Sequence, residues 1–260
     1  MIIIKAIILA AGQGTRLKKY TKDLPKGMLE FAGKTIIKHQ IDLYREIGID
    51  DIIIIRGYAG EKINYQGVKY YNNPKYEKTN MVYTLFCAEK ELNDDIIISY
   101  SDILFKKELL NILIKKKEDI VLPVDINWKE YWQKRYGKVN YDIESLQIND
   151  EGNVTNLGEE NVSLKKIDAR YIGLLKFSKT GVKKLKNVWN KNKKEFWNKP
   201  WKTSNKTLKN AYMTDILQAL IDEGNPIKAL CTNNGWLEFD TNEDYEKAKK
   251  WYNDNQIDFL

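Results

Sequence analysis

Residues 1–27 read MIIIKAIILAAGQGTRLKKYTKDLPKG: an apolar run comes first, and the segment from Leu9 onward holds three glycines and five basic residues. A continuous apolar run such as Ile2 to Leu9 is typical of a strand that is buried on both faces, as the central strands of parallel sheets are. Glycines let the backbone approach an anion closely, and the basic side chains supply positive charge. The stretch therefore predicts a buried strand that leads into a phosphate-binding loop.

Apolar runs recur along the chain, with helix-period segments between them. The runs cover residues 2–9, 52–55, 96–98, 120–124 and 171–177, and the helical segments cover 35–47, 79–92, 106–117, 180–196, 212–223 and 242–253. This alternation predicts an α/β fold with a Rossmann-like, doubly wound sheet that is mixed but mainly parallel. A length of 260 residues with 43% hydrophobic residues and five prolines fits one domain, residues 1–260.

The first apolar run is short and contains Lys5, so it is neither a membrane span nor a convincing signal peptide. We therefore expect a cytoplasmic protein without a membrane partner. Cys87 and Cys231 form no C-x-x-C pair, and we expect two reduced, partly buried thiols. The single histidine, His39, lies in a helical segment and is expected on a helix surface, which leaves no histidine-rich metal site.

Three strand ends offer polar or flexible residues. Residues 10–16 follow the first run, Arg56, Gly57 and Tyr58 follow the second, and residues 99–102 follow the third. Because ligands of open α/β sheets bind beyond the carboxyl ends of the strands, these three segments should line one crevice. Their convergence predicts a nucleotide site.

The first loop fits a triphosphate better than it fits other common phosphate motifs. A Walker loop would need Gly-Lys-Ser/Thr, and a dinucleotide fingerprint would need a third glycine where this chain has Leu17. Gly12 and Gly14 would present backbone N–H groups to phosphate oxygens. Arg16 could clamp the outer phosphates, and Lys26 could bring a point charge to the phosphorus under attack.

At this point the chain resembles a known family. LAAGQGTRL followed by PKGML resembles the signature of the sugar-phosphate nucleotidyltransferase superfamily. The resemblance continues through KTNMVYTLFCAEKEL, IIISYSDILF, VDINWKEYWQKR, ARYIGLLKFSKTG, MTDILQALIDEG and GWLEFDTNEDYEKA. This succession is similar to the cytidylyltransferase branch, which acts on phosphocholine, 2-aminoethylphosphonate or phosphoramidate acceptors.

The resemblance implies a GT-A-like fold in which residues 1–105 mainly bind the nucleotide and residues 120–240 mainly bind the acceptor. A small β excursion would form the acceptor pocket. The implied reaction joins CMP from CTP to a small phosphorylated or phosphonate acceptor and releases pyrophosphate. A sugar-1-phosphate nucleotidyltransferase that uses UTP or dTTP is the alternative. The sequence leaves a monomer and a homodimer open.

Three carboxylates are candidate magnesium ligands. Asp102 ends an apolar strand, where an unpaired carboxylate would be costly, and the resemblance makes it a metal ligand. Glu238 and Asp240 are two residues apart, so an extended chain would point both to one side. Oxygen ligands beside phosphate favour Mg²⁺ over zinc. The other interpretation of Asp240 is a cap on the helix that follows it.

The remaining site residues are assigned by the same reasoning. Catalysis is expected from Lys26, Arg16 and Asp102. Nucleotide binding is expected from Leu9, Ala10, Ala11, Gly12, Gly14, Thr15, Arg16, Lys26, Gly57, Tyr58, Asn80 and Ser101. Acceptor binding is expected from Asp125, Trp128, Arg135, Tyr171 and Trp236, where a carboxylate and aromatic faces would suit an amine or trimethylammonium group. Packing of Trp128 against Trp132 is the alternative for that pair.

A net charge of +7 permits a polyanionic partner. Tryptophans interleave with lysines in residues 191–210, as they do in some nucleic-acid-binding surfaces. A solvated helix end followed by a loop is the simpler interpretation, so nucleic-acid binding is a remote alternative and we expect no nucleic-acid partner.

Overall fold

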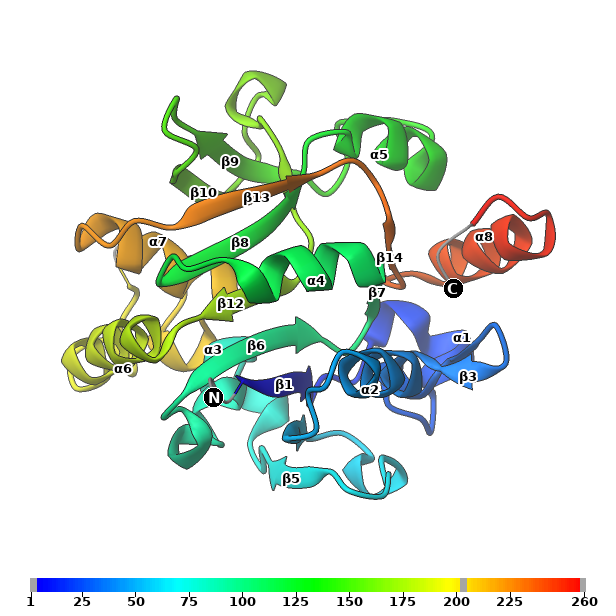
Figure 1. The fold of residues 1–260 in the computed structure, drawn as a ribbon, viewed down its shortest axis with the longest axis horizontal. Coiled ribbons are helices and arrows are strands. Elements are labelled where there is room, and N and C mark those ends of the chain that lie inside the picture. The colour runs from blue at the N-terminus through cyan, green and yellow to red at the C-terminus, as the bar shows by residue number, and fades with distance from the viewer. Residues whose placement is uncertain (1–3, 202–204, 258–260) are drawn as a thin grey trace.

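The computed structural model describes residues 4–201 and 205–257. Within them lies an eight-stranded sheet in the order β11-β8-β12-β6-β1-β4-β5, with β13 beside β8 (Figure 1). Its strands are β1 (Ile4–Ala10), β4 (Ile52–Arg56), β5 (Lys69–Asn72), β6 (Asp95–Tyr100), β8 (Ile120–Asp125), β11 (Arg170–Tyr171), β12 (Leu174–Phe177) and β13 (Lys228–Thr232). Strands β6, β1, β4 and β5 are parallel, whereas β12 runs antiparallel to both β6 and β8. The predicted mixed, mainly parallel α/β sheet is confirmed.

Helices cover both faces of this sheet (Figure 1). On one face lie α2 (Ile36–Glu46) and α4 (Lys107–Lys115), and on the other lie α3 (Met81–Phe86), α6 (Lys179–Lys193) and α7 (Met213–Asp222). The remaining helices are α1 (Lys18–Thr21), α5 (Trp128–Tyr136) and α8 (Asn242–Asn253). Short strand pairs are formed by β2 (Glu30–Phe31) with β3 (Lys34–Thr35), β7 (Ile103–Phe105) with β14 (Trp236–Glu238), and β9 (Glu144–Ile148) with β10 (Val154–Glu160).

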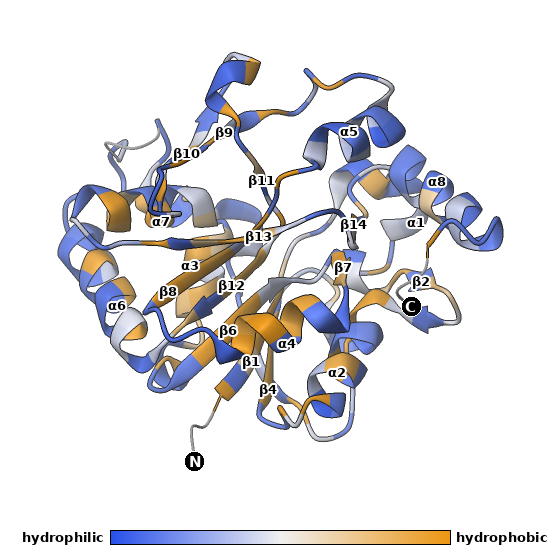
Figure 2. Cartoon of the chain, turned by 45° about the horizontal axis from the view of Figure 1, so that its top comes forward, coloured by the Kyte–Doolittle hydropathy of each residue, from blue (hydrophilic) through white to orange (hydrophobic). Residues whose placement is uncertain are grey.

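The first apolar run is continuous because alternate side chains of β1 enter different cores. Ala6 and Ile8 pack in the cluster beneath α2 and α4, whereas Ile7 and Leu9 pack in the cluster beneath α3, α6 and α7. All four are almost fully buried. The hydrophobic strands at the centre of Figure 2 are therefore covered on both sides, as their continuous rather than alternating apolar sequences predict.

The predicted strand at residues 171–177 is broken into β11 and β12. Gly173 has φ +80°, and a Cβ on it would lie 2.8 Å from the Tyr100 ring. A larger residue would meet both the backbone strain and the ring, so glycine allows the chain to turn here. The predicted helix at residues 79–92 is also shorter, because α3 ends at Phe86 and a 3₁₀ turn, Glu89–Glu91, follows.

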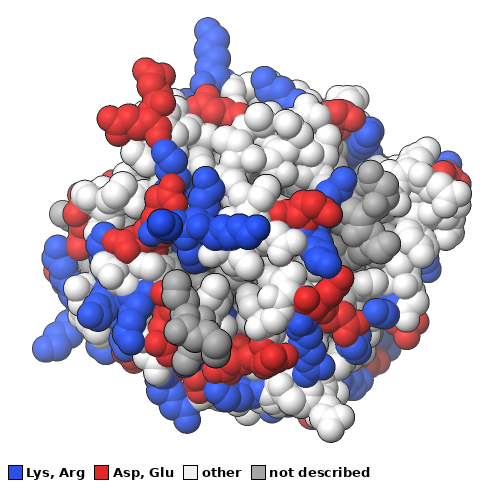
Figure 3. Space-filling view, viewed as in Figure 1, with Lys and Arg blue, Asp and Glu red and all other residues white. Residues whose placement is uncertain are grey.

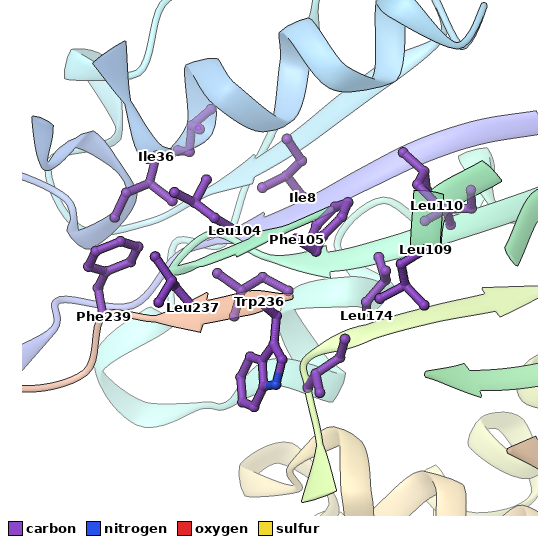
Figure 4. Close-up of a cluster of buried hydrophobic side chains, with 14 of the residues drawn as sticks. Ile8, Ile36, Leu104, Phe105, Leu109, Leu110, Leu174, Trp236, Leu237 and Phe239 are labelled. Carbon is purple, nitrogen blue, oxygen red and sulfur yellow. The ribbon is translucent and has the colours of Figure 1, made fainter. Parts of the chain in front are cut away.

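The β7–β14 pair joins two distant parts of the sequence. Glu238 of β14 lies opposite Ile103 of β7, and the backbone N–H of Phe239 donates to the carbonyl of Asp102 at 2.9 Å. Its buried apolar surroundings are shown in Figure 4 and include Ile36, Leu104, Trp236 and Leu237. This packing brings Asp102 and Glu238 to the same edge of the sheet.

Among the described residues, no helix is both long enough and apolar enough to cross a membrane. His39 lies on α2, and its Nε2 is 2.7 Å from the carbonyl oxygen of Phe31. Burial lowers the pKa of His39, which fits a structural helix residue. Cys87 is half-buried, but Cys231 on β13 is exposed, so the expectation of two partly buried thiols is wrong for Cys231.

Candidate active site

A cavity of about 310 Å³ lies beyond the carboxyl ends of β1 and β6. It is lined by Leu9, Ala11, Gly12, Gly14, Thr15, Arg16, Lys26, Tyr76, Thr79, Asn80, Met81, Thr84, Tyr100, Ser101, Asp102, Glu238 and Asp240. We call it the first cavity. It contains most of the residues that the sequence predicts for the nucleotide.

Two of the three glycines in the first loop lie where a side chain would be strained or crowded, whereas a Cβ on Gly12 would meet nothing within 4 Å. Gly14 has φ +68°, and a Cβ there would lie 3.0 Å from the Cβ of Lys26. The carbonyl of Gly14 accepts a hydrogen bond of 2.9 Å from Thr21, which fixes the turn. A Cβ on Gly27 would lie 2.7 Å from Ile37 and 2.8 Å from the carbonyl of Ser101. Close packing of the loop therefore places Lys26 beside the end of β6.

Gly57 and Tyr58 are not among the residues that line the first cavity, so their contact with the nucleotide stays a prediction. They support the loop instead. The N–H of Tyr58 donates to the carbonyl of Ala11 at 3.1 Å, and a Cβ on Gly57 would lie 2.5 Å from that same oxygen. Ala10 is likewise buried in the core and does not line the cavity.

Lys26 lies between two carboxylates. Its Nζ is 2.5 Å from Asp102 Oδ2 and 2.8 Å from Asp240 Oδ1. Burial alone would lower the pKa of Lys26, but the negative charges of Asp102 and Asp240 outweigh burial and raise it above its usual value. Burial would likewise raise the pKa of Asp240, but the charge of Lys26 lowers it. Lys26 is therefore a permanently charged ammonium in this cavity.

Arg16 extends the same chain of charges. Its Nη2 is 2.5 Å from Asp240 Oδ2, and its Nη1 is 3.3 Å from Asp142 Oδ2 on a segment 126 residues away. The N-cap of α8 is Thr241, whose hydroxyl accepts from the N–H of Asp244 at 3.1 Å. Asp240 is therefore not the helix cap, and its carboxylate is available to the two cations.

The three predicted metal ligands do not form a ready-made ligand cluster. No group of three or more Asp, Glu, His or Cys side chains able to hold a metal is found in the part of the chain that the structure describes. Lys26 separates Asp102 from Asp240, and Glu238 Oε2 is 2.6 Å from Arg135 Nη1. In this structure a lysine and an arginine pair with the three carboxylates, and the three-carboxylate metal site stays a prediction.

Several first-cavity residues were not predicted from the sequence. Asn80 was predicted, and its side chain caps α3 by accepting a hydrogen bond from the N–H of Met81 at 2.9 Å. The residues that were not predicted lie around the start of α3 or at the end of β6, where no loop motif marks them. They are Tyr76, Thr79, Met81, Thr84 and Tyr100.

A second cavity of about 280 Å³ adjoins the first and shares five lining residues with it. The shared residues are Arg16, Met81, Tyr100, Glu238 and Asp240. The residues that line the second cavity alone are Trp132, Asp142, Ile143, Glu144, Gly158, Glu160, Arg170, Tyr171, Ile172, Gly173, Tyr212, Thr214 and Trp236. Strands β9 and β10 form a small excursion beside the main sheet and supply Glu144, Gly158 and Glu160 to this list.

Only part of the predicted acceptor set lines this cavity. Tyr171 and Trp236 do, but Asp125, Trp128 and Arg135 do not. Asp125 is completely buried and accepts hydrogen bonds from the N–H groups of Asn127 and Asn234 and from the Trp236 indole. Asp125 is therefore a structural carboxylate in this fold, and its contact with an amine stays a prediction that this burial does not support.

Trp128 and Arg135 both lie on α5, a helix that the sequence analysis did not predict. Trp128 is 1% exposed and packs edge-on against Trp132, which confirms the packing interpretation for Trp128. Arg135 is also 1% exposed and forms ion pairs with Glu238 at 2.6 Å and with Asp244 at 2.8 Å. Arg135 therefore joins α5 to β14 and α8 and does not line the second cavity, so its contact with the acceptor stays a prediction that this burial does not support.

In its described part, residues 191–201 and 205–210, the lysine and tryptophan segment does not present a stacking surface. Trp201 is 5% exposed, and Trp197 packs against Tyr83 and Trp189 with ring centroids 5.7 and 6.2 Å apart. Residues 202–204 of this segment lie outside the described residues. On the face shown in Figure 3, basic and acidic side chains intermingle. These tryptophans pack inward, against the nucleic-acid interpretation.

The mixed α/β sheet and the glycine-rich loop are the features that the resemblance to nucleotidyltransferases predicts. The profile of the MobA-like NTP transferase domain matches residues 6–136. A CTP:phosphoglutamine cytidylyltransferase of Campylobacter jejuni subsp. jejuni is 36% identical over 254 residues, which are 94% of this chain and 98% of that protein. The chain therefore belongs to the MobA-like NTP transferase family and is a nucleotidyltransferase.

Two further relatives agree. A choline-phosphate cytidylyltransferase of Streptococcus pneumoniae is 40% identical over 149 residues, 56% of this chain and 64% of that protein. A solved structure of the CTP:phosphocholine cytidylyltransferase from Streptococcus pneumoniae superposes with a TM-score of 0.78 at 24% identity, covering 96% of this chain and all of that one. The similarity to cytidylyltransferases and the fold are thus confirmed.

Proposed function

We propose that this nucleotidyltransferase transfers CMP from CTP to a small phosphorylated acceptor and releases pyrophosphate. The observation that carries the proposal is the position of Lys26, which lies between Asp102 and Asp240 beside the edge that the two cavities share. CTP would occupy the first cavity and the acceptor the second. Two relatives that are cytidylyltransferases by name support the choice of CTP.

The acceptor that we propose is a phosphorylated amino-acid amide of the phosphoglutamine kind. The relative that is named for phosphoglutamine matches 94% of this chain, whereas the one named for choline-phosphate matches 56%. The second cavity also contains charged groups of both signs, including Glu144 and Arg170. A free amino acid is zwitterionic at neutral pH, so groups of both signs suit it.

The reaction needs little acid-base chemistry from the protein. An oxygen of the ionised acceptor phosphoryl group attacks the α-phosphorus of CTP, and the bond between that phosphorus and the bridging oxygen of pyrophosphate breaks. Arg16, Lys26 and the N–H groups of the first loop hold the negative charge that develops. The raised pKa of Lys26 keeps its charge in place throughout. Leu9, Ala11, Thr15, Asn80 and Ser101 line the space left for the nucleoside and the inner phosphates.

The residues present fit a divalent cation at one position. Asp102 Oδ1 is buried and has no hydrogen-bond partner among the described residues, while Oδ2 is held by Lys26. A buried, unpartnered carboxylate oxygen is costly unless a cation meets it. Asp102 and Asp240 would hold Mg²⁺ together with the phosphates, and the ion would supply Lewis-acid stabilisation of phosphoryl charge. Glu238 fits less well because Arg135 already binds it and burial raises its pKa.

Pyrophosphate release tests the donor and the acceptor together. CTP, UTP, dTTP and ATP are each combined with glutamine phosphoramidate, phosphocholine, 2-aminoethylphosphonate or glucose 1-phosphate in the presence of Mg²⁺. We expect CTP with the phosphoramidate to give the highest kcat/KM. Faster release from UTP or dTTP with glucose 1-phosphate would replace the proposal by the sugar nucleotidyltransferase alternative.

Asp102→Asn tests the metal assignment. The amide keeps the shape of the side chain but loses the charge that attracts a cation, so the Mg²⁺ concentration for half-maximal activity should rise by about 10-fold or more. Asp42→Asn is the matched control, because Asp42 pairs with Lys34 and Lys38 outside both cavities. An unchanged Mg²⁺ requirement in Asp102→Asn would contradict the assignment.

A further inference from the structure

Arg170 is a buried cation in the second cavity with an unused donor. It lies on β11, is 8% exposed, and its guanidinium lies 4.6 Å from the centre of the Trp132 ring. Nη1 and Nη2 donate to the carbonyls of Glu144 and Asp142, both at 3.2 Å. Nε is buried and has no hydrogen-bond partner within residues 4–201 and 205–257. A buried N–H of a charged group is costly to leave unpaired, so this donor points to a ligand.

Negative charge gathers near Arg170. Burial raises the pKa of the Glu144 carboxyl, Arg170 lowers it, and the charges of Asp142, Asp215 and Glu160 raise it further. Glu144 Oε1 is 3.9 Å from Arg170 Nη2, which is a loose ion pair. The Glu144 carboxylate therefore lacks full compensation, and a cationic group of the ligand would relieve the repulsion.

The residues that line both cavities show which end of the second cavity lies nearer to the nucleotide. Arg16 and Asp240 line both cavities, so the phosphoryl group of the acceptor, which must reach the nucleotide, belongs at their end. Arg170, Glu144 and Glu160 line the second cavity alone. They therefore surround the part of the acceptor that does not react.

We propose that Arg170 and Glu144 select an acceptor that carries an α-amino acid group at its non-reacting end. The guanidinium of Arg170 donates to the acceptor carboxylate, and Glu144 pairs with the ammonium group of the acceptor. This inference rests on the proposed function, since it assumes that the acceptor occupies the second cavity. It separates amino-acid acceptors from choline-like acceptors, which bring a cation but no carboxylate.

The first test uses the unmodified protein and a series of acceptors. Glutamine phosphoramidate is compared with its α-carboxamide analogue, its N-acetyl analogue and 2-aminoethylphosphonate, and the readout is pyrophosphate release from CTP. Loss of a hydrogen bond to a charged group costs about 1.5–3 kcal/mol. We therefore expect kcat/KM to fall by about 10- to 100-fold when the carboxylate is amidated, and by a similar factor when the amine is acetylated.

The second test uses variants. Arg170→Met should lower kcat/KM for glutamine phosphoramidate by about 10- to 100-fold and leave 2-aminoethylphosphonate, which has no carboxylate, within about 3-fold. Glu144→Gln should weaken both amine-bearing acceptors and spare the N-acetyl analogue. Arg45→Met and Glu151→Gln are the controls, because Arg45 is half-buried, Glu151 is exposed, and neither lines either cavity.

The outcomes separate the two proposals. If CTP yields no pyrophosphate with any acceptor, the proposed function fails. If CTP is used but the carboxamide analogue reacts as fast as the carboxylate, the inference fails and the function stands. Equal losses for all acceptors in Arg170→Met would also overturn the inference, because Arg170 would then only support the segment that contains Asp142 and Glu144.

Discussion

The two cavities are built in different ways. Seven of the residues that line the first cavity come from one stretch, which begins near the end of β1. They are Leu9, Ala11, Gly12, Gly14, Thr15, Arg16 and Lys26. The second cavity collects its own residues from segments that run from Trp132 to Trp236. The first cavity therefore has a local part that a loop motif marks, while its other ten lining residues, from Tyr76 to Asp240, are brought to it by the fold. The residues that line the second cavity but not the first come from segments that meet only in the folded chain. Substitutions in the first cavity should therefore affect the chemical step, and substitutions around the second cavity should affect recognition of the acceptor.

The largest effect is expected from Lys26→Met, which removes a cation of the first cavity that pairs with Asp240, a residue of both cavities. Turnover should fall by about 10²- to 10³-fold, the usual cost of losing one group that stabilises developing charge. Lys22→Met is the matched control, because Lys22 is exposed on the same loop. Turnover is followed as pyrophosphate release, and circular dichroism checks the fold.

The same experiment has a pH arm. The folded-state pKa of Lys26 is raised, so its ammonium stays charged at every pH below that raised value. Turnover should therefore show no loss from Lys26 titration up to about pH 9. Near-normal turnover in Lys26→Met, or a fall in wild-type turnover that disappears in this variant as pH rises toward 9, would contradict the role given to Lys26.

The next effect is on stability and comes from the side of the second cavity. Asp125→Asn replaces a buried carboxylate that accepts three hydrogen bonds, so the free energy of unfolding should fall by about 2–3 kcal/mol. Urea unfolding measures the loss, with the exposed Asp150→Asn as control. A normal unfolding curve combined with a raised KM for the acceptor would restore Asp125 to the acceptor site.

A smaller effect is expected from Gly57→Ala, which acts on the first cavity from outside. The new Cβ would lie 2.5 Å from the carbonyl oxygen of Ala11, so the first loop must shift. We expect roughly a tenfold loss in kcat/KM for CTP, because small misplacements of binding groups are costly in catalysis. The unfolding midpoint is measured beside it, and a loss of stability without any change in kcat/KM would show that the loop does not need this support.

The same contrast explains what the sequence could predict. The alternation of apolar runs and helices predicts the α/β sheet, and the loop chemistry of Gly14, Arg16 and Lys26 places them correctly in the first cavity. Gly57 and Tyr58 follow a strand end as predicted, but whether a backbone segment lines a cavity or supports its wall depends on the packing of Ala11. The division into residues 1–105 and 120–240 stays a prediction.

The acceptor residues were harder because residue type does not reveal the partner of a charge. Asp125 and Arg135 have the chemistry that an acceptor site needs, yet both are used to join segments about a hundred residues apart. Arg170 and Glu144 were missed, since they lie in ordinary strand sequence without a motif. Their role depends on the fold bringing β9 and β11 together, and no local sequence pattern predicts that the two strands are neighbours.

The smallest effects are expected at the two cysteines, which line neither cavity. Burial raises the pKa of Cys87 to about 11, so at pH 8 it holds little thiolate, whereas Cys231 is exposed on β13. A maleimide should therefore label Cys231 first, and mass spectrometry of Cys87→Ser and Cys231→Ser assigns each adduct. Both variants and the singly labelled protein should keep the wild-type kcat/KM within about 2-fold. Loss of activity on labelling Cys231 would show that the acceptor site extends to β13, and it would weaken the contrast drawn between the two cavities.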